Sequence, residues 1–337
     1  MSTITTTTPP RSAPSGAGLR GPVRVLVLQH RRALWTAGAL ALAGVVLLTA
    51  SVWWNSGTAD TYADTGCSYP DTSPRCLAAL DDVLSHQAWL RDVLRYVGTA
   101  MMVLPAAIGV FVAGPMIGRE LESGTYRLAW SQSVSPTRWL LAKLTVPAAI
   151  TVVAVPVLSA VYAWCRTSPD TDRVAWYDTS AYAATGTLPT ASALLAIAIG
   201  ALAALLVRRT LLAMSITALA YGAVALTLGA VRSSLWPVRT VITPLNATPA
   251  DLPGGTLFVG SGLMTGEQRL PGETCYQDPV PEVVDRCLAD HHITGIYTDF
   301  HPASHFWPLQ LVATGIVLVL AAAAVALAFR VLRRRHA

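Results

Sequence analysis

Residues 97–118 read VGTAMMVLPAAIGVFVAGPMIG, and this run decides the fold class of the chain. The run contains no Asp, Glu, Lys or Arg. It is long enough to cross the ~30 Å hydrocarbon core of a bilayer, which takes ~20 apolar helical residues at ~1.5 Å each. Charged residues, Arg119 and Glu120, follow at once. The stretch therefore predicts a transmembrane helix that emerges from lipid at residue 119.

The composition of the whole chain predicts the same environment. Of its 337 residues, 53% are hydrophobic and only 13% are charged, whereas a soluble domain carries roughly 25% charged residues. Five further runs are as long and lack Asp, Glu, Lys and Arg, at residues 33–54, 144–165, 182–207, 210–231 and 306–329. We therefore predict an all-α membrane protein with six transmembrane helices in residues 33–329, and exclude a globular cytosolic enzyme.

The basic residues predict which side of the membrane each segment faces, because Lys and Arg are in excess in cytoplasmic segments. Of the 24 Lys and Arg residues, 15 lie in residues 1–32, 119–143, 208–209 and 330–337. Both termini are thus expected in the cytoplasm, and the chain is expected to be a multi-pass protein of a bacterial plasma membrane. The outer loops are then residues 55–96, 166–181 and 232–305. The last of them is a large extracytoplasmic loop between the fifth and sixth helices.

The cytoplasmic lead and tail predict contacts with lipid. In the lead, residues 1–32, two interpretations of residues 22–32 remain open: a short interfacial helix, or only the positive flank of the first span. The basic tail, residues 330–337, is expected to contact anionic headgroups. Because basic residues are spread over four membrane-flanking segments and form no single stripe, no nucleic-acid partner is expected.

The sequence predicts no catalytic residue and no metal site on this chain. Its single lysine, Lys143, lies in Leu-Ala-Lys-Leu and cannot belong to a P-loop. The large outer loop contains neither H-E-x-x-H nor G-x-S-x-G. His301 precedes Pro302, which disfavours a helix that would present His301 and His305 on one face. We therefore interpret this loop as a solvated cap over the transport path.

The cysteines predict two disulfides on the outer side, where oxidation is permitted. Cys67 and Cys76 lie in the first outer loop, and Cys275 and Cys287 lie in the last. Local pairs are expected, with pairing between the two loops as the alternative. Cys165 is left over as a small apolar residue.

The six predicted spans also lack histidine. Carriers coupled to protons or ions usually place ionisable groups inside the bilayer. Such a carrier is therefore disfavoured, and an apolar path suits lipids or lipophilic compounds.

The most informative cytoplasmic segment follows the second span, and residues 114–144 read GPMIGRELESGTYRLAWSQSVSPTRWLLAKL. Gly124 can take positive φ and end a helix there, and Ser135-Pro136 marks a turn before the third span. A short charged helix followed by a turn can be pushed as a rigid unit. The alternative is an ordinary loop whose charges only set the topology.

This segment resembles the permease subunits of ABC-2-type ABC transporters, which carry an R-E-x-E-x-G-T-x-R-L-x-W-[ST]-Q-S-V pattern. The matching residues are Arg119, Glu120, Glu122, Gly124, Thr125, Arg127, Leu128, Trp130, Ser131, Gln132, Ser133 and Val134. The resemblance implies that this loop docks on a separate cytoplasmic ABC ATPase subunit. It implies that ATP and Mg²⁺ bind to that subunit and that this chain binds no cofactor. It also implies that a second permease copy or a homologous permease completes the path. It implies an exporter.

Two further hypotheses complete this interpretation. Glu120 and Glu122 are the only acidic residues in the predicted cytoplasmic segments. They are expected to pair with Arg119 and Arg127 or with basic residues of the ATPase, so that reversing both charges would leave abundance intact. A membrane-anchored sensor or assembly protein whose outer loop binds a ligand is the alternative function.

Overall fold

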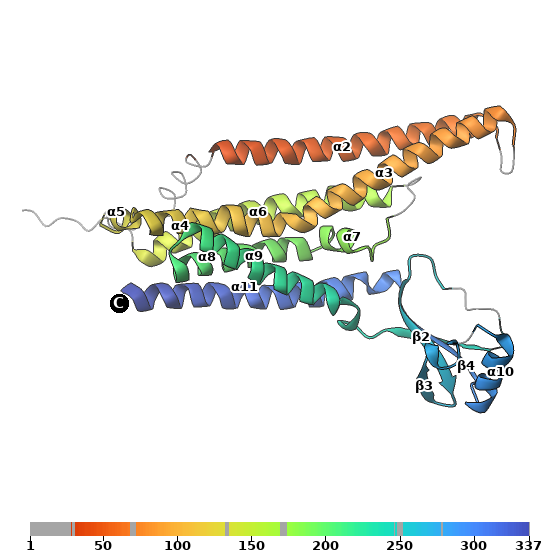
Figure 1. The fold of residues 1–337 in the computed structure, drawn as a ribbon. Helices are drawn as coiled ribbons and strands as arrows, with labels where there is room; N and C mark the ends of the chain where they lie inside the picture. The colour runs from red at the N-terminus through yellow and green to blue at the C-terminus, as the bar shows by residue number, and fades with distance from the viewer. Residues whose placement is uncertain are drawn as a thin grey trace, which may run out of the picture.

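The chain is a bundle of long helices with a small sheet beyond one end (Figure 1). The computed structural model describes residues 28, 31–67, 72–131, 135–168, 174–245, 247, 252–277 and 279–336. Within this part, six helices are long and apolar enough to cross a membrane. The lead and its proposed interfacial helix lie almost entirely outside the described residues, as do Gln132, Ser133 and Val134.

The elements follow one another along the chain with short connections. The helices of the bundle are α2 (Arg31–Asp64), α3 (Pro74–Ala107), the π-helix η1 (Ile108–Ala113), α4 (Gly114–Ser123), α5 (Tyr126–Ser131), α6 (Pro136–Thr167), α7 (Thr179–Ala184), α8 (Leu188–Val207), α9 (Thr210–Ala230) and α11 (Phe306–His336). Between α9 and α11 lie η2 (Arg232–Ser234), β1 (Arg239–Pro244), β2 (Leu257–Thr265), β3 (Gln268–Pro271), η3 (Gly272–Thr274), α10 (Pro281–Asp290), β4 (Gly295–His301) and η4 (Ala303–His305).

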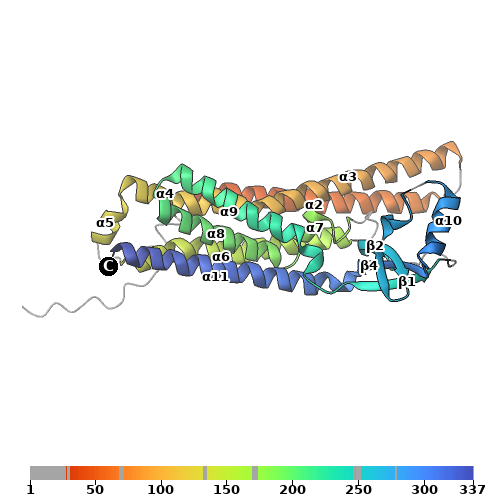
Figure 2. The ribbon, with the colours of Figure 1, turned by 60° about the horizontal axis from the view of Figure 1, so that its bottom comes forward.

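The bundle has two distinct ends. The start of α2, helix α5 and the C-terminus lie at one end, which we call the α5 end, and the strands lie beyond the other, which we call the sheet end (Figures 1 and 2). An even number of spans brings the first and last helices back to one end. Of the segments rich in arginine, the described residues 119–131, 135–143, 208–209 and 330–336 all lie at the α5 end.

Helix α8 lies at the centre of the bundle and contacts α3, η1, α4, α6, α9 and α11. Its sequence is rich in alanine, and small residues allow helices to approach closely in a membrane. The closest approach is to η1. A Cβ on Gly109 would lie 2.6 Å from the carbonyl oxygen of Ala196, and a Cβ on Gly200 would lie 2.8 Å from that of Gly109.

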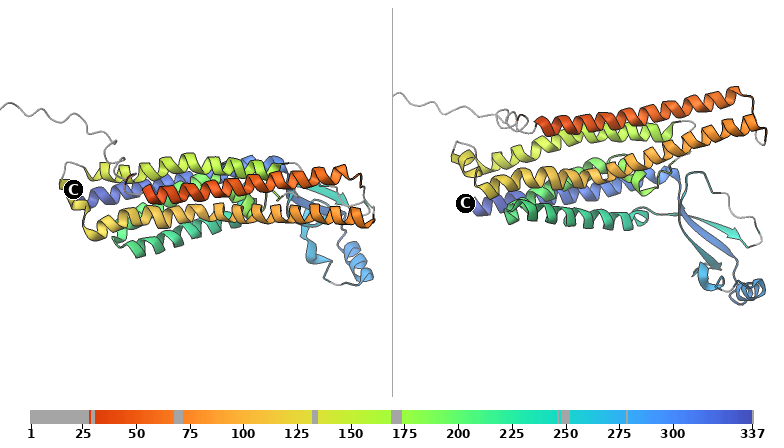
Figure 3. Two further views of the ribbon diagram at one scale, coloured as in Figure 1. Left: turned by 90° about the horizontal axis from the view of Figure 1, so that it is seen from above. Right: turned by 45° about the horizontal axis from the view of Figure 1, so that its top comes forward.

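Most of residues 55–96, expected as an outer loop, are helical instead. Helices α2 and α3 continue past the predicted spans as a long antiparallel pair (Figure 3). Buried Cys76, Val83 and Leu90 recur every seven residues, the spacing at which side chains of paired helices interlock. The sequence does not show this extension as an apolar run because charged residues on its exposed face interrupt the run.

The fold class needs a correction, because the segment predicted as the large outer loop, residues 232–305, contains a sheet and the protein is therefore not all-α. Four antiparallel strands lie in the order β1-β4-β2-β3. Helix α10 covers one face, where Leu263, Ile293 and Leu288 pack together. β-Branched and aromatic residues favour pleated strands, and β4, Gly-Ile-Tyr-Thr-Asp-Phe-His, is rich in them. β4 then leads through η4 into α11.

The predicted fourth span, 182–207, is broken near its start. Helix α7 ends at Ala184 and α8 begins at Leu188, with Gly186 at φ 78° between them. Gln310 of α11 bridges the break: its Nε2 donates to the carbonyl oxygen of Tyr182 at 2.8 Å, and its Oε1 accepts from the N–H of Leu188 at 3.3 Å. A fully buried glutamine thus satisfies backbone groups that helix ends leave unpaired.

The structure joins Cys67 to Cys76 and Cys275 to Cys287, with Cα–Cα distances of 5.7 and 5.5 Å, and leaves Cys165 free and buried. We expect non-reducing mass mapping of the native membrane protein to recover these two pairs. Cys165 should resist alkylation until the protein is unfolded, because a buried thiol is inaccessible. Recovery of a Cys67–Cys287 peptide, or alkylation of all five cysteines without reduction, would contradict the assignment.

Candidate functional site

Helices α3, η1 and α4 form one continuous helical stretch from Pro74 to Ser123. Helix α5 follows it at the α5 end of the bundle, and we call α4 and α5 together the α4–α5 segment. Helix α4 ends at Gly124, which takes φ 74° and ψ 2°, a left-handed conformation that favours glycine. The N–H of Arg127 donates to the carbonyl oxygen of Gly124 at 3.1 Å and starts α5. The turn between the two helices is therefore compact, as the sequence predicts.

Glu120 ties α4 to α6. Its Oε1 accepts from Lys143 Nζ at 2.6 Å and its Oε2 accepts from Trp139 Nε1 at 2.9 Å. The Lys143 side chain is only 7% exposed, whereas that of Glu120 is 26% exposed. The single lysine of the chain is thus buried against this carboxylate, and it depends on Glu120 for its charge partner.

Glu122 ties α4 to a different helix. Its Oε2 accepts from both the N–H and the hydroxyl of Thr210, at 3.0 and 2.7 Å. Thr210 is the first residue of α9. One α4 turn therefore carries two carboxylates that bind two separate helices, which is the main structural feature of this site.

Aromatic rings connect α5 to the bundle. The ring centroids of Tyr126 and Trp130 lie 4.7 Å apart, and those of Trp130 and Trp139 lie 6.1 Å apart, both edge to face. Tyr126 and Trp139 belong to the buried cluster of this end, together with Leu121. Arg127 lies beside Tyr126, and its hydrogen bond holds the pKa of the Tyr126 hydroxyl below its usual value. The packing of these rings holds α5 against the bundle.

Apart from Glu122, the exposed residues of this segment are basic or neutral. Arg119, Thr125, Arg127 and Arg138 are exposed, and Glu122, also exposed, is occupied by Thr210. We call Arg119, Thr125, Arg127 and Arg138 the α4–α5 surface. Its charge is positive because three of its four residues are arginines.

Of the two expected pairings of Glu120 and Glu122, the one with Arg119 and Arg127 is wrong, and the one with basic residues of the ATPase stays a prediction. Neither arginine bonds to either carboxylate in the described part of the chain. The three partners that the structure shows are Lys143, Trp139 and Thr210, and none of them was predicted from the sequence. One signal was present: a lone lysine in the apolar run Leu-Leu-Ala-Lys-Leu needs a buried anion.

The sheet end brings two histidines together, although no helix carries both. His301 Nδ1 lies 2.9 Å from His305 Nδ1, and His301 Nε2 lies 2.9 Å from the carbonyl oxygen of Ser233. His301 is the last residue of β4 and His305 is the last residue of η4. The turn between the strand and η4 therefore brings the two side chains together without a helix that contains both. Within the described residues, the one cluster of metal-binding type is Cys275, Cys287 and His291, and its two sulfurs form the disulfide and so present no thiolate.

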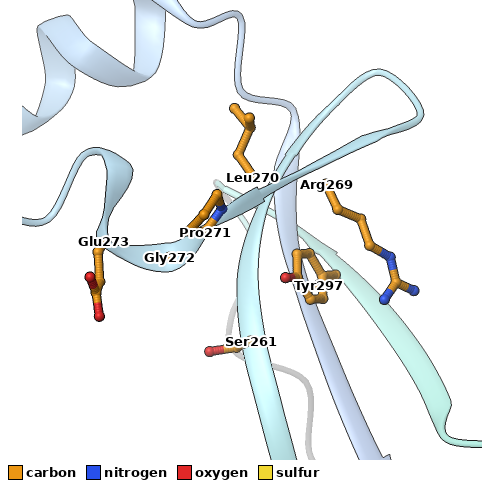
Figure 4. A pocket seen from close by; sticks show the side chains of 7 residues that line it. All are labelled: Ser261, Arg269, Leu270, Pro271, Gly272, Glu273 and Tyr297. Carbon is orange, nitrogen blue, oxygen red and sulfur yellow. The ribbon is translucent and has the colours of Figure 1, made fainter.

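An opening of about 580 Å³ lies against the sheet (Figure 4). Arg269 projects beside the Tyr297 ring in this view, with its Cζ 4.7 Å from the ring centroid. The same guanidinium bonds to Asp299 at 2.9 Å. The guanidinium of Arg269 therefore already has partners within the fold. The residues that line the opening form no arrangement of nucleophile, base and acid.

Six apolar helices define a multi-pass helical membrane protein. A family model described as ABC-2 membrane transporter related matches residues 37–232, more than half of the chain. The chain therefore belongs to this family of ABC transporter membrane components, which are not themselves catalytic. No curated protein and no solved structure matches the chain. The matched part includes the α4–α5 surface and ends before the sheet.

Proposed function

We propose that the chain is the permease subunit of an exporter whose separate cytoplasmic ATPase binds the α4–α5 surface. The observation that carries the proposal is the construction of α4 and α5: Gly124 makes the turn between the two short helices, Tyr126 packs α5 into the buried cluster, and α4 continues through η1 into α3. A force applied there moves α4 as a unit. ATP and Mg²⁺ would bind to the partner, since this chain has no P-loop.

The charge of the α4–α5 surface suggests the chemistry of the ATPase contact. Because Arg119 and Arg127 are exposed and bond to neither carboxylate of this segment, we expect acidic residues on the ATPase. Removing one member of a buried interfacial charge pair costs ~2–5 kcal/mol. The concentration of arginine at the α5 end also supports placing that end in the cytoplasm and the sheet outside.

The substrate we propose is lipophilic or amphiphilic. An apolar groove of about 250 Å³ lies between α6, α8 and α11. It is lined by Leu144, Ala148, Leu194, Ile197, Ala198, Leu318, Ala321, Ala322 and Val325. Such a wall suits acyl chains or other apolar groups, and a second permease copy or a homologous permease would complete the path.

A photo-crosslinking experiment tests the ATPase contact. A benzophenone amino acid in place of Thr125 should crosslink, in native membranes, to a protein whose peptides include a Walker A motif. The matched control replaces Glu267, which is also exposed but lies at the sheet end, and should give no such product. An Arg119→Ala/Arg127→Ala variant should lower the Thr125 crosslink about tenfold or more, since ~1.4 kcal/mol is a factor of ten.

Two results would refute the proposal. One is a Walker-motif protein captured from position 267 and not from 125, which would invert the orientation. The other is no ATPase product at either position, together with ligand-dependent crosslinks at 267, which would favour the membrane-anchored sensor.

A further inference from the structure

Helix α9 begins without a cap of its own. The first N–H groups of a helix need acceptors from outside it, and Ser, Thr, Asp or Asn at the N-cap position usually supplies one. The N-cap of α9 is Arg209, with φ −129° and ψ 124°, and its side chain makes no capping bond. The acceptor comes from Glu122, 88 residues earlier in the chain.

Close packing supports this contact. A Cβ on Gly118, one turn before Glu122 on α4, would lie 3.2 Å from Thr210 Cα. Beyond this point α9 is largely exposed, and its buried residues are Ala213, Thr217 and Tyr221. The start of α9 is thus held against α4 by a carboxylate cap and a glycine contact.

We infer that Glu122 is a positioning residue that makes α9 follow α4 when the ATPase moves the α4–α5 unit. The inference rests on the proposed function, because it requires that movement. Glu120 and Glu122 are two positions apart, so they leave α4 in different directions. One binds α6 and the other binds α9, which gives a single moving helix separate links to two others.

The cap and the link can be separated by substitution. Glu122→Ala removes both, and Arg209→Ser places a favourable N-cap residue on α9 itself. The double variant Glu122→Ala/Arg209→Ser therefore has a capped α9 with no tie to α4. We expect Glu122→Ala to lower Tm by about 2–4 °C and the added Arg209→Ser to restore it.

The link is measured with spin labels in the complex of this chain and its ATPase, reconstituted in vesicles. One label replaces Leu226 on α9 and another replaces Val153 on α6, which are 77% and 67% exposed. Trapping with ADP and vanadate should change the mobility of both labels in the parent chain and in Arg209→Ser alone. A sample without engineered cysteines corrects for labelling of buried Cys165.

In Glu122→Ala/Arg209→Ser, the change in mobility of the label at 226 should be about tenfold smaller. The reason is that this variant loses the charge-assisted hydrogen bond that biases the position of α9. The response at 153 should remain, and Glu122→Gln, whose carbonyl accepts the same two bonds, should retain most of the response at 226. Two results would overturn this inference and leave the proposed function standing. One is a double variant whose label at 226 responds as strongly as in the parent chain. The other is a parent chain that binds the ATPase but shows no response at 226. Absence of ATPase binding to the parent would overturn the proposed function as well.

Discussion

Glu120→Ala is expected to destabilise the protein far more than Lys143→Met, although both break the same 2.6 Å ion pair. Removing Glu120 leaves a buried ammonium without a partner, which costs ~3–5 kcal/mol. Removing Lys143 leaves a carboxylate that still accepts from Trp139 and reaches water. Thermal unfolding in detergent measures the difference.

The double variant Glu120→Ala/Lys143→Met is the matched control. It should recover much of the loss, because it buries no unpaired charge. Equal losses in the two single variants, or no recovery in the double variant, would show that Lys143 is solvated in the membrane protein.

The ion pair also revises the expectation for charge reversal. Glu120→Lys would place a second ammonium against Lys143, so the double reversal of Glu120 and Glu122 is now expected to lower abundance. That variant therefore cannot isolate ATPase binding. Arg119 and Arg127, which are exposed, are the appropriate positions.

Gly200→Ala is expected to destabilise the bundle, although Ala favours helices over Gly by ~1 kcal/mol. The new Cβ would lie 2.8 Å from the carbonyl oxygen of Gly109 and 3.1 Å from Ala113 Cβ. Backbone cannot yield as a flexible side chain does, so α8 and η1 must separate, at ~1–3 kcal/mol for an overpacked contact. A fall in Tm and in folded yield measures the effect.

Gly222→Ala provides the control within the same membrane domain. This glycine lies in α9 with nothing within 4 Å of its Cβ position, so helix propensity alone should act and stability should stay level or rise. If Gly200→Ala behaves like Gly222→Ala, the close approach of α8 to η1 is absent from the protein in its membrane.

Sequence reasoning succeeded where one local property decides the structure. The fifth span, predicted at 210–231, is observed as α9 at Thr210–Ala230, because length and apolarity suffice to define a helix in lipid. It was less accurate where charge and apolarity mix along a helix, as in α3 before residue 97. There the seven-residue spacing carries the signal, and a search for apolar runs cannot detect it.

The sequence by itself determined the six apolar helices, their even number and the glycine that ends α4. Each follows from hydrophobicity, spacing or backbone freedom within one short segment. Only the tertiary structure decided the partners of Glu120 and Glu122, the bridging role of Gln310 and the meeting of His301 with His305. These contacts join residues that are brought together by helix packing or chain reversal, and the charge or polarity of a side chain alone does not specify which of several possible partners it reaches.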